Sequence, residues 1–217
     1  MKQLAHLLSW VFLPLFMPIY ALMMAMYIPS NQDYLLNEDS LFYLTNEAKY
    51  AVIYMFFVFG LLSPAVAIIL LRRFNIISTI DMENQRERNI PMFIMLTCCL
   101  LLYFLFIWRV GNNILPKYVY ALPLSGIFVT ASFTYINRWI KISLHAGGAG
   151  ILSGFLIAYA FAQIEFQYWV IIVAFLISGL TMSARLFLHK HTPTEVFSGW
   201  ILATLLTFSI NFLYPIG

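Results

Sequence analysis

Residues 168–187 read YWVIIVAFLISGLTMSARLF, a run of 20 residues in which Arg185 is the only charged side chain. A helix needs about 20 apolar residues to cross the hydrocarbon core of a bilayer, because each residue advances it by about 1.5 Å. This run therefore predicts a transmembrane helix. Further apolar runs occupy residues 8–28, 50–71, 92–110, 118–136, 147–163 and 196–214.

The composition of the chain agrees with this pattern. Of the 217 residues, 62% are hydrophobic and only 10% are charged, whereas a soluble domain has about 25% charged residues. This excludes a soluble globule, a disordered chain and a nucleic-acid-binding protein, all of which need more charge. The runs are continuous, not alternating, which disfavours a β-barrel. We expect one all-α membrane domain over residues 1–217, a bundle of six to seven transmembrane helices with the bilayer as its partner.

The first run, residues 8–28, has a second interpretation as a cleaved signal peptide because it follows Lys2. Its apolar stretch is longer than the core of a signal peptide, and it lacks a convincing small-residue cleavage site. We therefore expect it to be a retained helix that crosses the membrane.

The loops between the runs differ in charge. With seven crossings, the N-terminus and residues 72–91, 137–146 and 186–195 would share one face of the membrane, and they hold most of the basic residues. Because Lys and Arg accumulate in cytoplasmic loops, the charge count places this face in the cytoplasm of a bacterial-type inner (plasma) membrane. Some of these bases could instead be present to bind a ligand, so the orientation stays open at this point.

Three polar clusters in these loops carry candidate chemistry: residues 81–91 (DMENQRERNIP), 141–148 (KISLHAGG) and 184–200 (ARLFLHKHTPTEVFSGW). Ionisable residues beside membrane helices are costly and usually functional. Converging arginines suit a phosphate-like oxyanion. Two histidines on opposite sides of that anion can act as nucleophile and acid, and a carboxylate can orient one ring. Such a site needs no metal, because the arginines stabilise the charge of the transition state.

Two of these clusters resemble signatures of the type 2 phosphatidic acid phosphatase (PAP2) family. The third cluster is similar to S-R-x5-H-x3-D through Arg185, His191 and Glu195, at the same spacing, with alanine in place of serine and glutamate in place of aspartate. The second cluster is similar to P-S-G-H through Ser143 and His145, without the proline and the glycine.

The first cluster resembles the remaining signature, K-x6-R-P, only loosely. Arg88 stands for the arginine, Pro91 lies three residues after it, and Asp81 occupies the lysine position. Arg86 is a candidate to replace the missing lysine. The resemblance extends over residues 81–200 in all.

The resemblance implies a division of roles within the site. It implies that His145 is the general acid, that His191 is the nucleophile that forms a phosphohistidine, and that Glu195 orients the His191 ring. It also implies phosphate binding by Arg185 and Ser143. We predict as further phosphate-binding residues Arg86, Arg88 and Lys141. No metal and no organic cofactor are expected.

Some of these residues have simpler interpretations. Thr192, Pro193 and Glu195 also fit a capping box at the start of the last helix, and this is compatible with an anion site, because helix starts bind anions. His189 has no place in the family pattern and is expected to lie at the membrane interface. The arginines at positions 86 and 88 could also be topology signals alone.

The sequence therefore predicts an integral membrane phosphatase that hydrolyses a lipid phosphate or diphosphate, of the phosphatidate, phosphatidylglycerophosphate or polyprenyl diphosphate type. One alternative is a membrane prenyltransferase, in which Asp81, Glu83 and Glu87 would hold magnesium, although a second acidic cluster is missing. Another is a binder or transporter of lipid phosphates that kept the anion site without turnover. Many bacterial members of the resembled family act on the outer face of the membrane, in conflict with the charge count.

Overall fold

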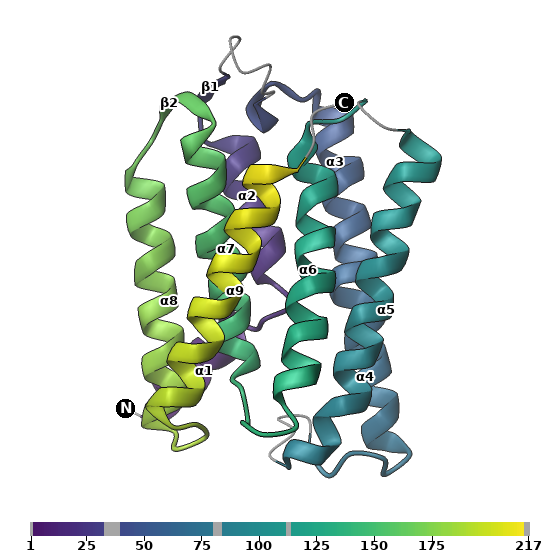
Figure 1. Cartoon of the computed structure of the whole chain (residues 1–217), viewed down its shortest axis with the longest axis vertical. Coiled ribbons are helices and arrows are strands. Elements are labelled where there is room, and N and C mark those ends of the chain that lie inside the picture. Colours follow the sequence, from purple (N-terminus) through teal and green to yellow (C-terminus); the bar gives the residue numbers. More distant parts are fainter. Residues whose placement is uncertain (1, 33–39, 80–83, 112–113, 215–217) are drawn as a thin grey trace.

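The computed structural model describes residues 2–32, 40–79, 84–111 and 114–214 (Figure 1). The α-helices are α1 (Lys2–Val11), α2 (Met17–Tyr27), α3 (Asn46–Met55), α4 (Ser63–Arg73), α5 (Asn89–Leu105), α6 (Lys117–Ile136), α7 (Leu144–Phe161), α8 (Trp169–Phe187) and α9 (Pro193–Leu213). Shorter elements are the 3-10 turns η1 (Leu41–Tyr43) and η3 (Gln85–Arg88) and the antiparallel strands β1 (Ser30–Gln32) and β2 (Gln163–Phe166). The π-helical segments η2 (Phe56–Leu62) and η4 (Phe106–Val110) continue α3 into α4 and extend α5.

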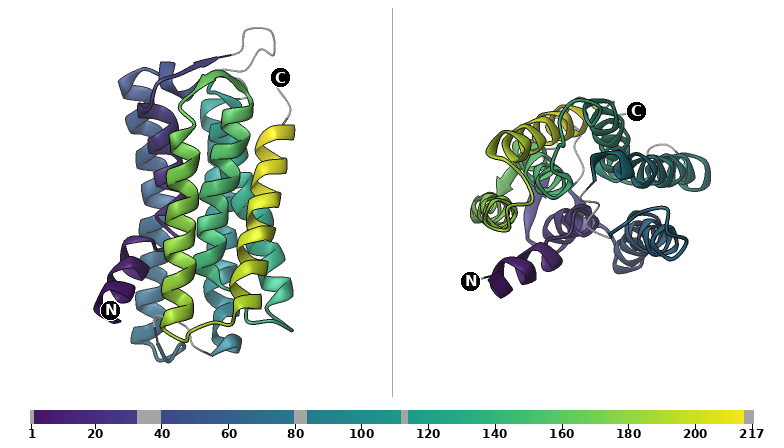
Figure 2. Two further views of the ribbon diagram at one scale, coloured as in Figure 1. Left: turned by 90° about the vertical axis from the view of Figure 1, so that its left-hand side faces the viewer. Right: turned by 90° about the horizontal axis from the view of Figure 1, so that it is seen from below.

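Six helical segments are long and apolar enough to cross a membrane: Asn46–Arg73, Gln85–Val110, Lys117–Ile136, Leu144–Phe161, Trp169–Phe187 and Pro193–Leu213. They stand side by side along the long axis of the molecule (Figures 1 and 2). The prediction of an all-α, multi-pass membrane bundle is confirmed.

The prediction of one continuous spanning helix at residues 8–28 is wrong. Residues 12–16 leave the helical path between α1 and α2, and Pro14 lies in this break. Proline has no N–H to donate and clashes with the preceding turn, so it ends a helix. With 11 residues, α2 is too short to cross the hydrocarbon core at about 1.5 Å per residue.

The polar loops are sorted to the two ends of the bundle. The N-terminus, the α6–α7 loop and the α8–α9 loop lie at the lower end in Figure 1, together with the end of α4 and the start of α5. The two strands lie at the upper end, to which α2 carries the chain despite its length. The described residues of the three polar clusters therefore lie at one end, although α2 is not a full span.

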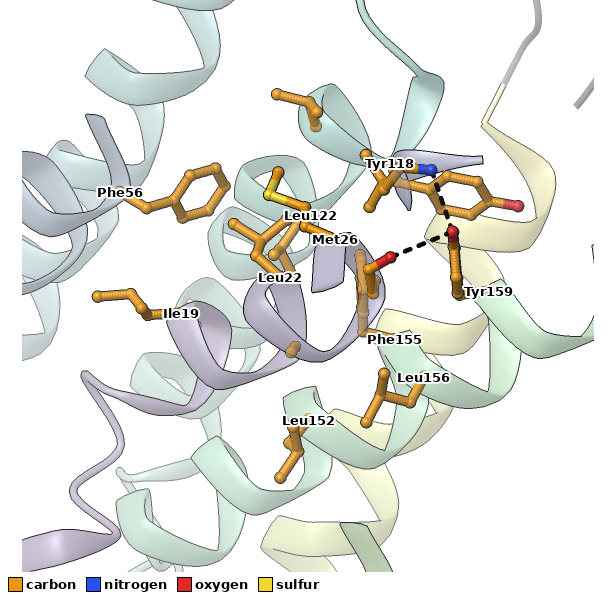
Figure 3. Close-up of a cluster of buried hydrophobic side chains, with 14 of the residues drawn as sticks. Ile19, Leu22, Met26, Phe56, Tyr118, Leu122, Leu152, Phe155, Leu156 and Tyr159 are labelled. Atoms are coloured by element: carbon orange, nitrogen blue, oxygen red, sulfur yellow. Dashed lines mark hydrogen bonds between the residues drawn. The ribbon is translucent and has the colours of Figure 1, made fainter. Parts of the chain in front are cut away.

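Helix α7 is the central helix, and its glycines explain how closely it packs. A Cβ at Gly150 would lie 2.6 Å from the Trp200 carbonyl oxygen, and one at Gly154 would collide with the Thr204 carbonyl oxygen. Small residues let membrane helices approach this closely. At the upper end, the Tyr159 hydroxyl of α7 meets Ser30 Oγ at 2.9 Å and accepts from the Leu41 N–H at 3.0 Å. Figure 3 shows Tyr159 among the apolar side chains of the core.

Candidate functional site

The described parts of the three polar clusters are joined at the lower end of the bundle by hydrogen bonds to main-chain carbonyls. Arg88, at the end of η3, donates from a guanidinium nitrogen to the Ile142 carbonyl at 2.8 Å. The Ser143 N–H donates to the Glu195 carbonyl at 3.2 Å. Lys141 Nζ donates to the Lys190 carbonyl at 3.4 Å. Loops far apart in the sequence thus form one platform.

The loop that carries His191 is held by regular structure on both sides. Helix α8 ends in a Schellman motif, in which His189 adopts a left-handed φ of 53° and the Lys190 N–H donates to the Arg185 carbonyl at 3.2 Å. Helix α9 begins with the expected capping box, since Thr192 Oγ1 accepts from the Glu195 N–H and the Glu195 carboxylate accepts from the Thr192 N–H. Only a short turn remains between the two caps, which restricts where His191 can lie.

Glu195 contacts the His191 ring as well as capping α9. Its Oε2 lies 2.9 Å from His191 Nδ1. A carboxylate can only accept, so Nδ1 carries the hydrogen in a neutral ring, and Nε2 is left with its lone pair. The capping role and the orienting role of Glu195 therefore coexist in one side chain.

The surroundings of His191 favour a neutral ring. The residue is buried, and this burial lowers its pKa to about 4; the Glu195 carboxylate opposes the shift, while the charges of Arg88 and Arg185 add to it. At neutral pH the ring is therefore an uncharged base with an available nitrogen lone pair.

His145 lies in the first turn of α7, because Ser143 is the N-cap of that helix. The Ser143 hydroxyl accepts from the Ala146 N–H at 3.4 Å. His145 Nε2 lies 3.3 Å from the main-chain oxygen of Ser9 in α1. A carbonyl oxygen is an acceptor only, so Nε2 is the donor in this contact. Ser9 lies in the last turn of α1, where carbonyls lack helical partners.

A cavity of about 340 Å³ joins these groups. Its polar lining includes His145, His191, Arg88 and Arg185. Both arginines are 3% exposed, and their charges act on both histidine rings. The remainder of the cavity is mostly apolar and runs between α2, η2, α4, α5 and α6; representative lining residues are Ile19, Phe56, Gly60, Ile69, Met95 and Leu122.

Three residues predicted to bind phosphate do not line this cavity. Ser143 is fully buried and uses its hydroxyl to cap α7. Lys141 reaches the carbonyl of Lys190, and Arg86 is exposed beside Asn84, whose side chain accepts from its N–H. Loop geometry turns these side chains away, although their sequence positions are close to the histidines.

The acidic cluster considered for magnesium is described only in part. Asp81 and Glu83 lie outside the described residues. Glu87 accepts from the Ser78 N–H at 2.7 Å and from its hydroxyl at 2.9 Å. Among the residues that the structure does describe, no group of three or more His, Cys, Asp or Glu side chains is placed to hold a metal ion.

Sequence reasoning missed the contribution of α1. His6, Ser9 and Trp10 line the cavity, and the Ser9 carbonyl is the partner of His145. A main-chain oxygen has no signature in the sequence, so only Pro14, as the site of the break between α1 and α2, could have pointed to a separate first helix.

No family model matches this chain, and comparisons with curated proteins and with solved structures also found no match. The relationship to the PAP2 family therefore stays a prediction that rests on the residues quoted above.

Proposed function

We propose that the protein is an integral membrane phosphatase of the PAP2 type that acts on a lipid phosphate or diphosphate through a phosphohistidine at His191. The observation that carries the proposal is the pairing of His191 Nδ1 with Glu195 at 2.9 Å beside a cavity that His145, Arg88 and Arg185 also line. This is the arrangement of nucleophile, orienting carboxylate, acid and anion-binding groups that the chemistry needs.

His191 is suited to attack phosphorus. Glu195 occupies Nδ1, so the lone pair of Nε2 forms the bond to phosphorus while the bond from phosphorus to the lipid oxygen breaks. The ring gains positive charge in this step, and the Glu195 carboxylate stabilises it. Water then attacks phosphorus and forms the new phosphorus–oxygen bond while the phosphorus–nitrogen bond breaks, which releases phosphate and returns the lone pair to Nε2 of a neutral His191.

Arg88 and Arg185 supply the positive charge for the phosphoryl oxygens. Both are buried, where a guanidinium interacts with an anion more strongly than it would in water. Stabilising the charge on the transferring group is the main catalytic task in phosphoryl transfer. Arg88 is also fixed by its bond to the Ile142 carbonyl, which orients its planar group.

His145 is the proposed acid for the leaving lipid oxygen. Its Nε2 is directed at the Ser9 carbonyl, so the proton for the leaving group would come from Nδ1 of the doubly protonated ring, a form that the bound phosphate anion would favour against the charges of Arg88 and Arg185. In the second step the same nitrogen would accept a proton from the attacking water, which restores the starting state.

The shape of the cavity supports a lipid substrate. Charged and polar groups gather at one part, and an apolar part continues between the helices. A head group with one hydrocarbon chain attached would match both parts. The charge count of the loops favours a cytoplasmic site in an inner (plasma) membrane.

A substrate panel tests the proposal. The purified full chain, reconstituted in bilayers, should release phosphate from at least one of phosphatidate, phosphatidylglycerophosphate and a polyprenyl diphosphate. His191→Ala should lower kcat by at least about a thousandfold, as expected for loss of a nucleophile. His189→Asn is the matched control, because His189 is exposed, lies two residues away and does not line the cavity. Full activity in His191→Ala would refute the mechanism.

The second candidate is a lipid-phosphate binder without turnover. It is favoured by the contact that occupies His145 Nε2 and by the position of Ser143 and Lys141 outside the cavity. Labelled substrate distinguishes the two: a phosphohistidine trapped at His191 supports the phosphatase, whereas saturable lipid binding without phosphate release supports the binder.

A further inference from the structure

Helix α1 is attached to the bundle by a narrow stripe of small residues. Only Ala5 and Ser9, one helical turn apart, are buried, at 6% exposure each, and α1 packs against α8. The next segment is held at Pro14, because a Cβ on Gly148 of α7 would come within 2.6 Å of the Pro14 Cα. Beyond this stripe, α1 extends away from the bundle at its lower end (Figure 2).

The opposite face of α1 is apolar and is not covered by the described part of the chain. Leu4 and Leu7 are 58% and 59% exposed, and Val11 continues the same face, since residues spaced by three and seven positions align on a helix. Trp10 is also exposed. An apolar face with a tryptophan at the end of a transmembrane bundle fits the interface of a bilayer, where such helices insert among lipid head groups and acyl chains.

The same helix reaches the site through its main chain. The Ser9 carbonyl is the hydrogen-bond partner of His145, and Ser9, His6 and Trp10 line the cavity. Any movement of α1 therefore changes both the partner of the His145 ring and one wall of the cavity.

We propose that α1 is a membrane-interface helix that positions His145 through the Ser9 carbonyl, so that the geometry of the site depends on the lipid in which the leucine face of α1 is embedded. Lipid holds α1 from one side, and the stripe of Ala5 and Ser9 holds it from the other. In this arrangement Ser9 is a positioning residue that acts through its backbone, and the bilayer is the partner that keeps it in place.

The test measures how well α1 shields His145 from a chemical reagent, so it does not depend on substrate turnover. The inference rests on the role proposed above for His145. The full chain in nanodiscs of phosphatidylcholine and phosphatidylglycerol is treated with diethylpyrocarbonate. Mass spectrometry then compares the modification rate of His145 with that of the exposed His189. In the variant Leu4→Gln/Leu7→Gln we expect this ratio to rise several-fold, because α1 leaves the interface.

Two further variants complete the test. Leu205→Gln is the matched control, because Leu205 is also 58% exposed but lies on α9; its ratio should equal that of the wild-type chain. Ser9→Leu places a larger side chain in the buried stripe between α1 and the bundle. It should also raise the ratio, because α1 can then no longer pack as closely over His145. An unchanged ratio in either the double-leucine variant or Ser9→Leu would overturn the proposal, as would an equal rise in Leu205→Gln. Since the readout is chemical protection, absence of phosphatase activity would leave this result intact.

Discussion

The apolar part of the cavity makes a prediction about chain length in the substrate. Gly60 lines the cavity, and a Cβ built on it meets no atom within 4 Å. Gly60→Phe can therefore place its ring in space that we assign to the hydrocarbon chain, without a backbone clash. Glycine is also a poor helix former, so the substitution carries no intrinsic penalty to the helix.

The size of the effect follows from the hydrocarbon that is displaced. Each buried methylene contributes about 0.8 kcal/mol, and a phenyl ring that excludes three or four methylenes would cost about 3 kcal/mol. This corresponds to a loss of about a hundredfold in kcat/KM for a long-chain lipid phosphate. A short-chain, water-soluble phosphate ester does not reach the apolar part, so its kcat/KM should stay unchanged.

The assay compares long-chain and short-chain substrates in the wild-type chain, Gly60→Phe and a control. Gly179→Phe is the matched control, because a Cβ at Gly179 also meets nothing within 4 Å and this residue does not line the cavity. Equal losses for both substrates in Gly60→Phe would point to damage at the reacting end instead. Unchanged turnover of the long-chain substrate would refute the assignment of this space to the chain.

Three further predictions concern the site and its support. Glu195→Gln should lower kcat by about 10²–10⁴-fold, because the His191 ring loses the carboxylate that fixes its tautomer. The melting temperature should change little, because glutamine at this position can also accept from the Thr192 N–H in a capping box; a loss of stability with full activity would contradict the orienting role. Burial lowers the pKa of His191 in the folded chain to about 4, below the value of about 6.5 in an unfolded chain. Between these two pH values the unfolded chain therefore binds one proton more than the folded chain. The stability that neutral His191 contributes is complete above pH 6.5 and is lost as the pH falls toward 4. Denaturation in detergent across this range should show that decline, and His191→Gln should reduce it. Gly154→Val should destabilise the bundle by about 2 kcal/mol or more, because its side chain collides with the Thr204 carbonyl; a melting temperature equal to that of the wild-type chain would show that α7 and α9 pack less tightly than described.

Features that depend on neighbours along the chain could be predicted from the amino-acid sequence. Apolar runs of transmembrane length predicted the bundle, because the hydrocarbon core fixes the length of a spanning helix. The capping box at Thr192 was predicted from residues local to one helix start, and the contact between His191 and Glu195 was predicted from the resemblance to the PAP2 signature. Pro14 indicates the break between α1 and α2, but it lies inside an apolar run long enough to be predicted as one continuous helix.

Which polar groups reach the cavity depends on long-range packing and could not be predicted from the sequence. Arg88 is fixed by a carbonyl 54 positions later in the sequence, and His145 by a carbonyl 136 positions earlier; a main-chain acceptor leaves no trace in the residue type. Ser143 and Lys141 were expected in the phosphate site. Instead, the Ser143 hydroxyl accepts from a main-chain N–H of α7 and Lys141 donates to a loop carbonyl, because a polar side chain near a helix end binds the unpaired backbone groups within its reach. That choice depends on how the loops dock, which long-range packing sets.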